Sequence, residues 1–175
     1  YYIAKLAGKF VKVILSGVGG DEIFGGYPWR YFYGRENNNL DEYVDNYFNY
    51  WQKILNYKEL EKLLLPIKSE IGSYNVKNQF KEVFKPYYNK NLELNNMGNL
   101  SLYFESKTFL NGLLLVEDRI SMSNGMETRL PFLDNDLVNF AQKIPLKFKI
   151  KNLKKEIRFN ENLQGNKREK YFNIT

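Results

Sequence analysis

The pattern of hydrophobic and polar positions predicts a mostly helical chain with one clear strand. The strand lies in 11–15, where Val13-Ile14-Leu15 form a short apolar run with β-branched residues, which is typical of a buried strand. Residues 1–9 have the pattern of a helix end, with Gly8 as the C-terminal stop. Apolar residues at helical spacing predict further helices over 40–55, 57–65, 73–85, 96–116 and 136–143.

Three shorter features add to this prediction. Asn39 precedes the helix over 40–55 and is a typical N-cap residue. Residues 130–133, Leu-Pro-Phe-Leu, predict a buried extended turn before the helix over 136–143. The aromatic residues in 27–33 are expected to pack against the core, although a platform for stacking bases is also consistent with them.

A glycine-rich loop follows the predicted strand. It contains Ser16, Gly17, Gly19 and Gly20, and Asp21 comes directly after it. Glycines let the backbone turn sharply and approach a ligand, and their N–H groups, with the serine hydroxyl, can hold an anion such as a phosphate. The acid can be the N-cap of a following helix, lie in that helix's first turn, or bind Mg²⁺. These residues alone leave two interpretations open, a turn with an acidic cap and a nucleotide site.

Two sequence blocks resemble motifs of one enzyme family. Residues 16–27, Ser-Gly-x-Gly-x-Asp-Glu-Ile-Phe-Gly-Gly-Tyr, are similar to the second phosphate-site motif of the asparagine synthetase family. Residues 118–134 resemble that family's Asp-Arg-x-Ser-Met…Glu-x-Arg-x-Pro-Phe-Leu-Asp segment. The blocks occur in the family's order, and the resemblance covers residues 1 to about 155.

The resemblance implies a fold and a place within a longer chain. The fold is an α/β synthetase domain of the adenine-nucleotide α-hydrolase (Rossmann-like) type. Residues 1–175 correspond to its C-terminal portion, mostly helical with one clear parallel strand. Within this portion, 37–90 resembles a helical insertion, and 143–175 forms a basic tail. The chain begins without Met, and we expect Tyr1 to be a cut end within a longer chain.

The resemblance also implies an activity. Members of the family activate a substrate carboxylate with ATP, release pyrophosphate, and form an amide with ammonia made from glutamine in a separate domain. The implied nucleotide-binding residues are Ser16, Gly17, Gly19 and Gly20. Asp21 is then a Mg²⁺ ligand, and Asp118 and Arg119 lie near the activated substrate as catalytic residues. An alternative for the second block is a structural ion pair, either Asp118–Arg119 or Glu127–Arg129.

Several departures from the family pattern limit this assignment. Val18 stands where many asparagine-forming members have an acid, so the substrate is aspartate or a relative, such as a sugar acid of a surface polysaccharide. The family's first ATP motif and its glutamine-cleaving domain are missing from the sequence. The family's catalytic lysine is expected beyond Thr175, because Lys167 and Lys170 lack its sequence context. We therefore expect the chain to be inactive alone.

Composition narrows the chemistry further. The chain has neither cysteine nor histidine, which excludes disulfides, thiolate metal sites and histidine bases from it. Its apolar runs are shorter than the roughly 20 residues of a membrane span, and a cytoplasmic location is expected. The net charge of +6 resides in 143–175, which we interpret as a solvated basic face. A non-catalytic binding subunit, a basic nucleic-acid-binding module and a homo-oligomer are left open.

Overall fold

The computed structural model describes residues 1–31, 37, 39–52, 55–88 and 97–150. The chain divides into two compact units, each treated by itself. Unit 1 comprises Tyr1–Phe32 and Leu102–Thr175, and unit 2 comprises Tyr33–Ser101. The basic tail beyond Ile150, and with it most of the predicted basic face, lies outside the described residues.

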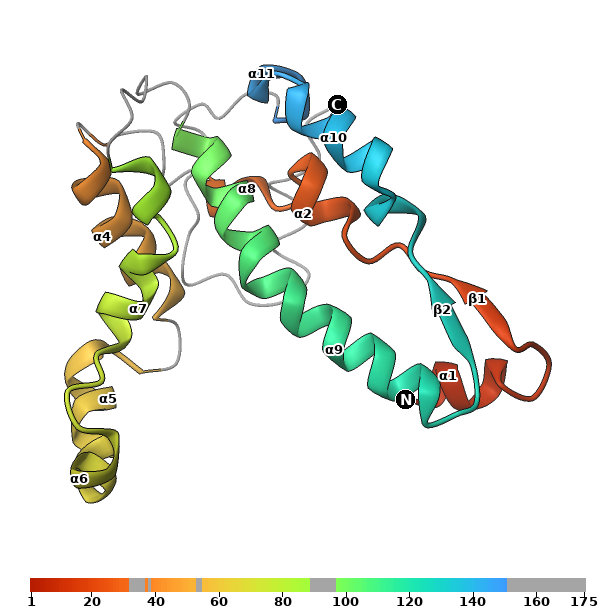
Figure 1. Ribbon diagram of the computed structural model, residues 1–175, viewed down its shortest axis with the longest axis horizontal. Coiled ribbons are helices and arrows are strands. Elements are labelled where there is room, and N and C mark those ends of the chain that lie inside the picture. Colours follow the sequence, from red (N-terminus) through yellow and green to blue (C-terminus); the bar gives the residue numbers. More distant parts are fainter. Residues whose placement is uncertain (32–36, 38, 53–54, 89–96, 151–175) are drawn as a thin grey trace. The chain divides into compact units, whose positions relative to one another are not determined.

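Unit 1 contains both sequence blocks and all the strands among the described residues (Figure 1). Its N-terminal part consists of α1 (Tyr2–Ala7), β1 (Val13–Leu15), α2 (Gly20–Phe24) and α3 (Pro28–Tyr31). Its C-terminal part begins within α8 (Met97–Lys107), which spans the unit boundary. It continues through α9 (Phe109–Met122), β2 (Glu127–Arg129), the 3₁₀ helix η5 (Pro131–Leu133), α10 (Asn135–Lys143) and α11 (Leu146–Lys149).

The two strands form a parallel pair in which Val13 lies opposite Glu127 and Leu15 opposite Arg129. The ladder extends beyond the strands, because the Glu127 N–H donates to the Lys12 carbonyl at 2.8 Å and the Ser16 N–H donates to the Arg129 carbonyl at 2.9 Å. The sequence pattern predicts one clear strand, which is β1, and it does not identify β2 as the partner strand. Glu-Thr-Arg has no apolar alternation, so pairing with β1 decides its conformation.

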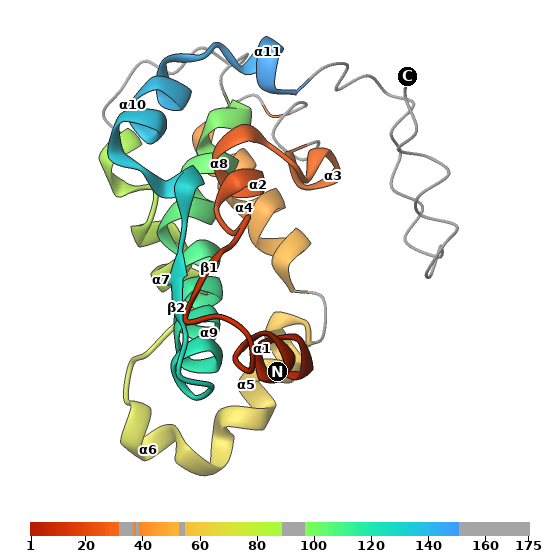
Figure 2. The same ribbon diagram turned by 90° about the vertical axis from the view of Figure 1, so that its right-hand side faces the viewer.

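The strand at 13–15 is confirmed, but its predicted burial is wrong. Val13 is 51% exposed and Leu15 is 75% exposed, while Ile14 is half-buried. Parallel sheets are normally covered on both faces. Here α9 contacts β2 and meets it at the turn that joins them, as Figures 1 and 2 show, and the other described elements of unit 1 leave the Val13 and Leu15 side chains open to solvent.

Unit 2 is helical. Its elements are α4 (Leu40–Trp51), α5 (Tyr57–Leu64), η2 (Leu65–Ile67), α6 (Lys68–Ile71), α7 (Val76–Glu82), η3 (Lys85–Tyr87) and the first half of α8. The core of the unit is aromatic. The rings of Tyr43 and Tyr47 stack with centroids 5.5 Å apart, and Phe80 meets Phe48 at 5.2 Å and Phe84 at 5.6 Å. Such pairs add to the free energy gained from apolar burial.

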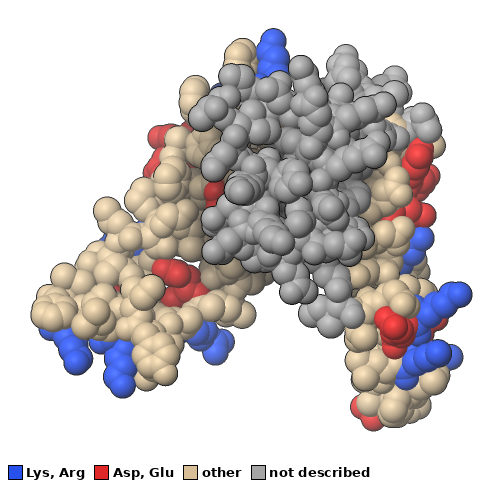
Figure 3. Space-filling model, turned by 180° about the vertical axis from the view of Figure 1, so that it is seen from behind, with Lys and Arg blue, Asp and Glu red and all other residues tan. Residues whose placement is uncertain are grey.

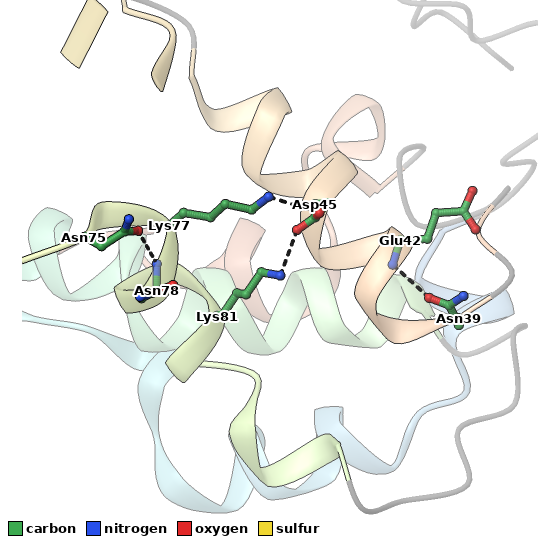
Figure 4. Close-up of polar contacts among 7 residues, drawn as sticks. All are labelled: Asn39, Glu42, Asp45, Asn75, Lys77, Asn78 and Lys81. Carbon is green, nitrogen blue, oxygen red and sulfur yellow. Dashed lines mark hydrogen bonds and ion pairs between the residues drawn. The ribbon is translucent and has the colours of Figure 1, made fainter. Parts of the chain in front are cut away.

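Asparagine N-caps begin three helices of unit 2. The Asn39 side chain accepts a hydrogen bond from the Glu42 N–H at 2.9 Å, which confirms the predicted cap (Figure 4). Asn56 forms a reciprocal capping box with Glu59, and Asn75 accepts from the Asn78 N–H at 3.0 Å. Each side chain satisfies a helix N–H that has no partner within the helix.

Other sequence predictions need correction. The helix expected over 96–116 is two helices, separated at Thr108, and the second continues to Met122. The turn expected at 130–133 contains a 3₁₀ helix rather than extended backbone, and Phe132 is 42% exposed. The helix expected over 136–143 is confirmed and is capped by Asp134. None of the described helices is both long and apolar enough to cross a bilayer.

Candidate nucleotide site

The loop after β1 turns tightly and leads directly into α2. Gly19 has a φ of +94°, a conformation that favours glycine, and it is the N-cap of α2. The Gly20 N–H donates to the Gly17 carbonyl at 3.2 Å, and the Val18 N–H donates to the Ser16 hydroxyl at 3.4 Å. The loop is therefore held by its own hydrogen bonds at the carboxyl end of β1.

The second block packs directly against this loop. The Leu133 side chain occupies the position that a Cβ on Gly19 would take, and the Phe132 ring lies 3.3 Å from the corresponding position on Gly20. The Phe132 ring also meets the Phe24 ring edge-on, with centroids 6.4 Å apart. Two segments far apart in sequence thus meet at one end of the strand pair, and Gly19 and Gly20 both have a packing reason to lack a side chain.

Gly17 is different from these two glycines. A Cβ added to Gly17 would have no heavy atom within 4 Å beyond its neighbours, so the loop is open at this point. Among the described residues, the Gly17 and Gly19 N–H groups have no hydrogen-bond acceptor. Free N–H groups with a nearby hydroxyl are the chemistry that binds phosphate oxygens. The arrangement fits an anion at Ser16 and Gly17 better than at Gly20.

The two acids in the first turn of α2 differ in their exposure to solvent. Asp21 is exposed, whereas Glu22 is only 2% exposed and accepts a hydrogen bond from the Tyr27 hydroxyl at 3.1 Å. Burial, followed by the nearby charge of Glu22, raises the pKa of Tyr27 far above its ordinary value. The hydroxyl thus stays protonated and remains a donor. Of the two acids, only Asp21 is open to an external ligand.

A buried polar group that the sequence patterns did not predict contacts α3. Glu105 in α8 is fully buried and forms an ion pair with Arg30 at 3.3 Å. It also accepts a hydrogen bond from the Tyr31 hydroxyl at 3.3 Å. The Arg30 guanidinium lies over the rings of Tyr27 and Phe109, at 3.8 Å and 4.4 Å from their centroids. A single glutamate among apolar helix positions was the available signal.

Asp118 and Arg119 lie on α9, where the structure places both on exposed positions. Among the described residues, neither side chain makes a hydrogen bond or an ion pair. No such interaction therefore joins them to the loop at 16–21. The expected local ion pair is confirmed for Glu127 and Arg129, at 2.9 Å between exposed side chains. The catalytic assignment of Asp118 and Arg119 therefore stays a prediction.

The metal assignment has one candidate ligand in this part of the chain. The described residues contain no group of three or more acidic side chains that could hold a metal ion by themselves. Mg²⁺ is usually bound by one or two carboxylates, with water and phosphate oxygens completing the shell. An exposed Asp21 beside a loop with free N–H groups fits such a shared site.

A cavity of about 600 Å³ lies elsewhere, in unit 2. Its lining residues all belong to 57–76 and include the apolar side chains Leu60, Leu64 and Ile71. It shares no residue with either sequence block. We place the candidate site at the glycine loop, because that is where the two blocks meet.

Comparison with known proteins gives the family. The family model "Asparagine synthase" matches residues 1–172, and the chain belongs to this family. It is 30% identical over 180 residues to asparagine synthetase (glutamine-hydrolyzing) 1 of Bacillus subtilis (strain 168), covering 87% of this chain and 28% of that protein. It is also 30% identical over 147 residues to asparagine synthetase (glutamine-hydrolyzing) 3 of the same strain, covering 81% and 22%. The chain thus spans about a quarter of these relatives. No solved structure matches it.

Proposed function

We propose that the chain forms part of the synthetase site of an ATP-dependent, amide-forming ligase. In this reaction a substrate carboxylate oxygen attacks the α-phosphorus of ATP and pyrophosphate leaves. Ammonia derived from glutamine then attacks the acyl carbon of the acyl-adenylate, AMP leaves, and an amide forms. The substrate class is aspartate or a related carboxylate. Family membership supports the general reaction, and the larger adenine-nucleotide α-hydrolase-like fold is part of the same proposal.

The observation that carries the proposal is the meeting of the two blocks. β1 and β2 pair in parallel, and Leu133 and Phe132 pack against Gly19 and Gly20. In open α/β sheets, ligands bind outside the carboxyl ends of the strands. Both blocks reach that end here, which is what a shared nucleotide site requires.

Each residue of the site has a proposed role. The Ser16 hydroxyl and the Gly17 N–H bind phosphate oxygens, while Gly19 and Gly20 shape the loop around them. Asp21 supplies a carboxylate to Mg²⁺, which when bound would neutralise charge on the triphosphate. Asp118 and Arg119 act on the activated substrate, and the rest of the site comes from parts of the parent protein outside this sequence.

Calorimetric titration with ATP and Mg²⁺ tests the binding role. We expect Asp21→Ala to weaken Mg²⁺-dependent nucleotide binding by about 10-fold or more. The matched control is Asp136→Ala, which removes another exposed acid from the first turn of a helix in the same unit. Equal affinity of both variants, or no binding by the wild-type chain, would contradict the proposal.

Turnover by the isolated chain provides a second test. Because the first ATP motif and the glutamine-cleaving domain are missing from the sequence, we expect no steady release of pyrophosphate from ATP. Steady release that Asp21→Ala abolishes would show that the chain needs no further part of the site. The measurement is a coupled pyrophosphate assay with ATP, ammonia and aspartate.

Val18 favours a second candidate, a non-catalytic binding subunit. Its apolar side chain is half-buried in the loop, and it can neither accept a proton nor hydrogen-bond to an amine. Nucleotide binding without pyrophosphate release by the full-length protein, with ammonia and either aspartate or a sugar acid, would favour this candidate. Amide formation from one of these carboxylates would exclude it and identify the substrate.

A nucleic-acid-binding role has less support. Lys5, Lys9 and Lys12 are exposed around α1 and the turn into β1, and Figure 3 shows basic side chains at this end of the unit (lower left). They lie on a short helix and a turn, and the predicted basic tail lies outside the described residues. A strongly salt-dependent shift of DNA or RNA would be needed to support this role.

A further inference from the structure

The Asp21 carboxylate has an unusual position relative to the chain that follows it. It occupies the space that a Cβ on Gly26 would take. The Asp21 carbonyl also accepts hydrogen bonds from the N–H groups of Gly25 at 2.8 Å and Gly26 at 2.9 Å. The backbone after α2 therefore folds back over Asp21, and a side chain at position 26 would have to displace the Asp21 side chain.

The two adjacent glycines have different reasons to be glycine. Gly25 has a φ of +82°, so a side chain there would strain the backbone as well as meet Ile150. Gly26 is not among the glycines with positive φ, so its backbone suits any residue. An alanine at position 26 would place its methyl group in the space that the Asp21 carboxylate occupies.

The neighbouring acid is held away from solvent by a chain of contacts. Glu22 accepts from the Tyr27 hydroxyl, Arg30 lies over the Tyr27 ring, and the buried Glu105 pairs with Arg30. The Tyr27 ring also packs against the small core of Tyr31, Leu102 and Ile150. These contacts fix the first turn of α2 from the protein side. The Tyr27 hydroxyl also lies close enough to the exposed Asp21 carboxylate for that carboxylate to raise the pKa of the hydroxyl, after burial and Glu22.

We propose that Gly26 and Tyr27 are positioning residues for the Asp21 carboxylate. Gly26 provides the space in which the carboxylate lies, and Tyr27 donates to the buried Glu22 while lying beside Asp21, so that it holds the Asp21 carboxylate at the loop. The role of Asp21 toward a metal rests on the proposed function, whereas the positioning itself is a property of this chain. Neither residue needs to touch a ligand.

A double-mutant cycle on thermal stability tests the positioning without any ligand. We expect Gly26→Ala to lower the melting temperature by about 2–8 °C, because the added methyl group meets the Asp21 side chain and overpacking shifts a chain of this size by that amount. Adding Asp21→Ala removes the carboxyl group, and we expect the double variant to recover at least half of the loss. Additive losses would overturn the proposal.

The matched control is Gly112→Ala, at an exposed position on α9 where a Cβ would have no neighbour within 4 Å. Its effect should add to that of Asp21→Ala without coupling. If Gly26→Ala does not fold, an NMR cross-peak between the Asp21 β-protons and the Gly26 α-protons of the wild-type chain decides the question. Its presence supports the proposed position of the carboxylate, and its absence overturns it.

Titration with ATP in the presence and absence of Mn²⁺ then links positioning to the metal. We expect Gly26→Ala and Tyr27→Phe to weaken Mn²⁺-dependent ATP binding by about 10-fold while changing Mn²⁺-free ATP binding little. Equal weakening in both conditions would indicate a merely structural role and overturn the link. If the wild-type chain does not bind ATP, the proposed function fails, while the melting-temperature cycle still tests the positioning.

Discussion

The two units use the same ion-pair chemistry in opposite surroundings. In unit 1, Glu105 is fully buried beside Arg30, whereas in unit 2, Asp45 is 43% exposed and pairs with Lys77 at 3.0 Å and Lys81 at 3.1 Å (Figure 4). Removing one partner of a buried pair leaves an uncompensated charge, while exposed pairs contribute little. We infer that unit 1 depends on its polar contacts and unit 2 on its aromatic core.

The largest expected effect is at Glu105. Glu105→Ala leaves Arg30 and the Tyr31 hydroxyl without this acceptor, and we expect it to lower the free energy of unfolding by about 3–5 kcal/mol. Glu105→Gln keeps an acceptor oxygen and should have a smaller effect. Urea denaturation measures both.

Glu82→Ala is the control for this change, because it removes an exposed glutamate from an exposed ion pair with Lys85. Its expected effect is within about 0.5 kcal/mol. Similar losses for Glu105→Ala and Glu82→Ala would remove the contrast between buried and exposed charge on which the comparison rests.

A smaller effect is expected inside the core of unit 2. The Tyr43 and Ser101 hydroxyls are hydrogen-bonded at 2.7 Å, and both residues are fully buried. Tyr43→Phe leaves the Ser101 hydroxyl without this partner and should lower the free energy of unfolding by about 1–2 kcal/mol. The double variant with Ser101→Ala should recover part of the loss, and a double variant less stable than both singles would contradict this account.

The helix cap at Asn39 should contribute less to the free energy of unfolding than the hydrogen bond between Tyr43 and Ser101. Asn39→Ala removes the acceptor for the Glu42 N–H and should cost about 1 kcal/mol of stability. Asn39→Asp keeps a capping oxygen and is the matched control. Equal losses for alanine and aspartate in thermal unfolding would show that the cap does not stabilise α4.

The smallest expected effect is the pH dependence of stability that arises from the Asp45 carboxyl. Partial burial acts to raise the pKa of the Asp45 carboxyl, but hydrogen bonds from Lys77 and Lys81 outweigh it and hold the pKa below its ordinary value. Because the folded-state pKa is depressed, this stabilisation is present above the unfolded-state pKa, near 4, and is lost as pH falls through the folded-state value. For a partly exposed group we expect less than about 1 kcal/mol.

Comparing wild type with Asp45→Asn from pH 7 to pH 2 checks this expectation. The difference in the free energy of unfolding should shrink as the pH falls below about 4. It should also shrink in high salt, because ions screen exposed charges. A difference that grows on acidification would mean that the sign is wrong.

Local signals explain which parts of the fold could be predicted from sequence. α4 follows from Asn39 and from apolar spacing within one segment. β2 could not be predicted, because Glu127-Thr128-Arg129 becomes a strand only by pairing with Val13-Ile14-Leu15. The charges at Asp118 and Arg119 did not end the helix at 116, because their side chains face solvent on α9.

In the candidate site, too, some features could be predicted from the sequence and others depend on the fold. The loop residues Ser16 to Asp21 could be identified from spacing and family resemblance. The space at Gly26 and the burial of Glu22 could not, because both depend on how the chain folds back after α2. Glu105 lies outside both blocks, so only the folded chain reveals its contact with Arg30.

The parallel pairing of β1 and β2 also has a kinetic consequence. The two strands lie near opposite ends of the described chain, so closing the segment between them carries a large entropic cost before any strand contact forms. The helices of 33–101, by contrast, meet over shorter separations in sequence, as Asp45 with Lys77 and Tyr43 with Ser101 show. We expect those helices to fold first and shorten the effective loop, with strand pairing, and therefore completion of the glycine loop, as a late step in folding.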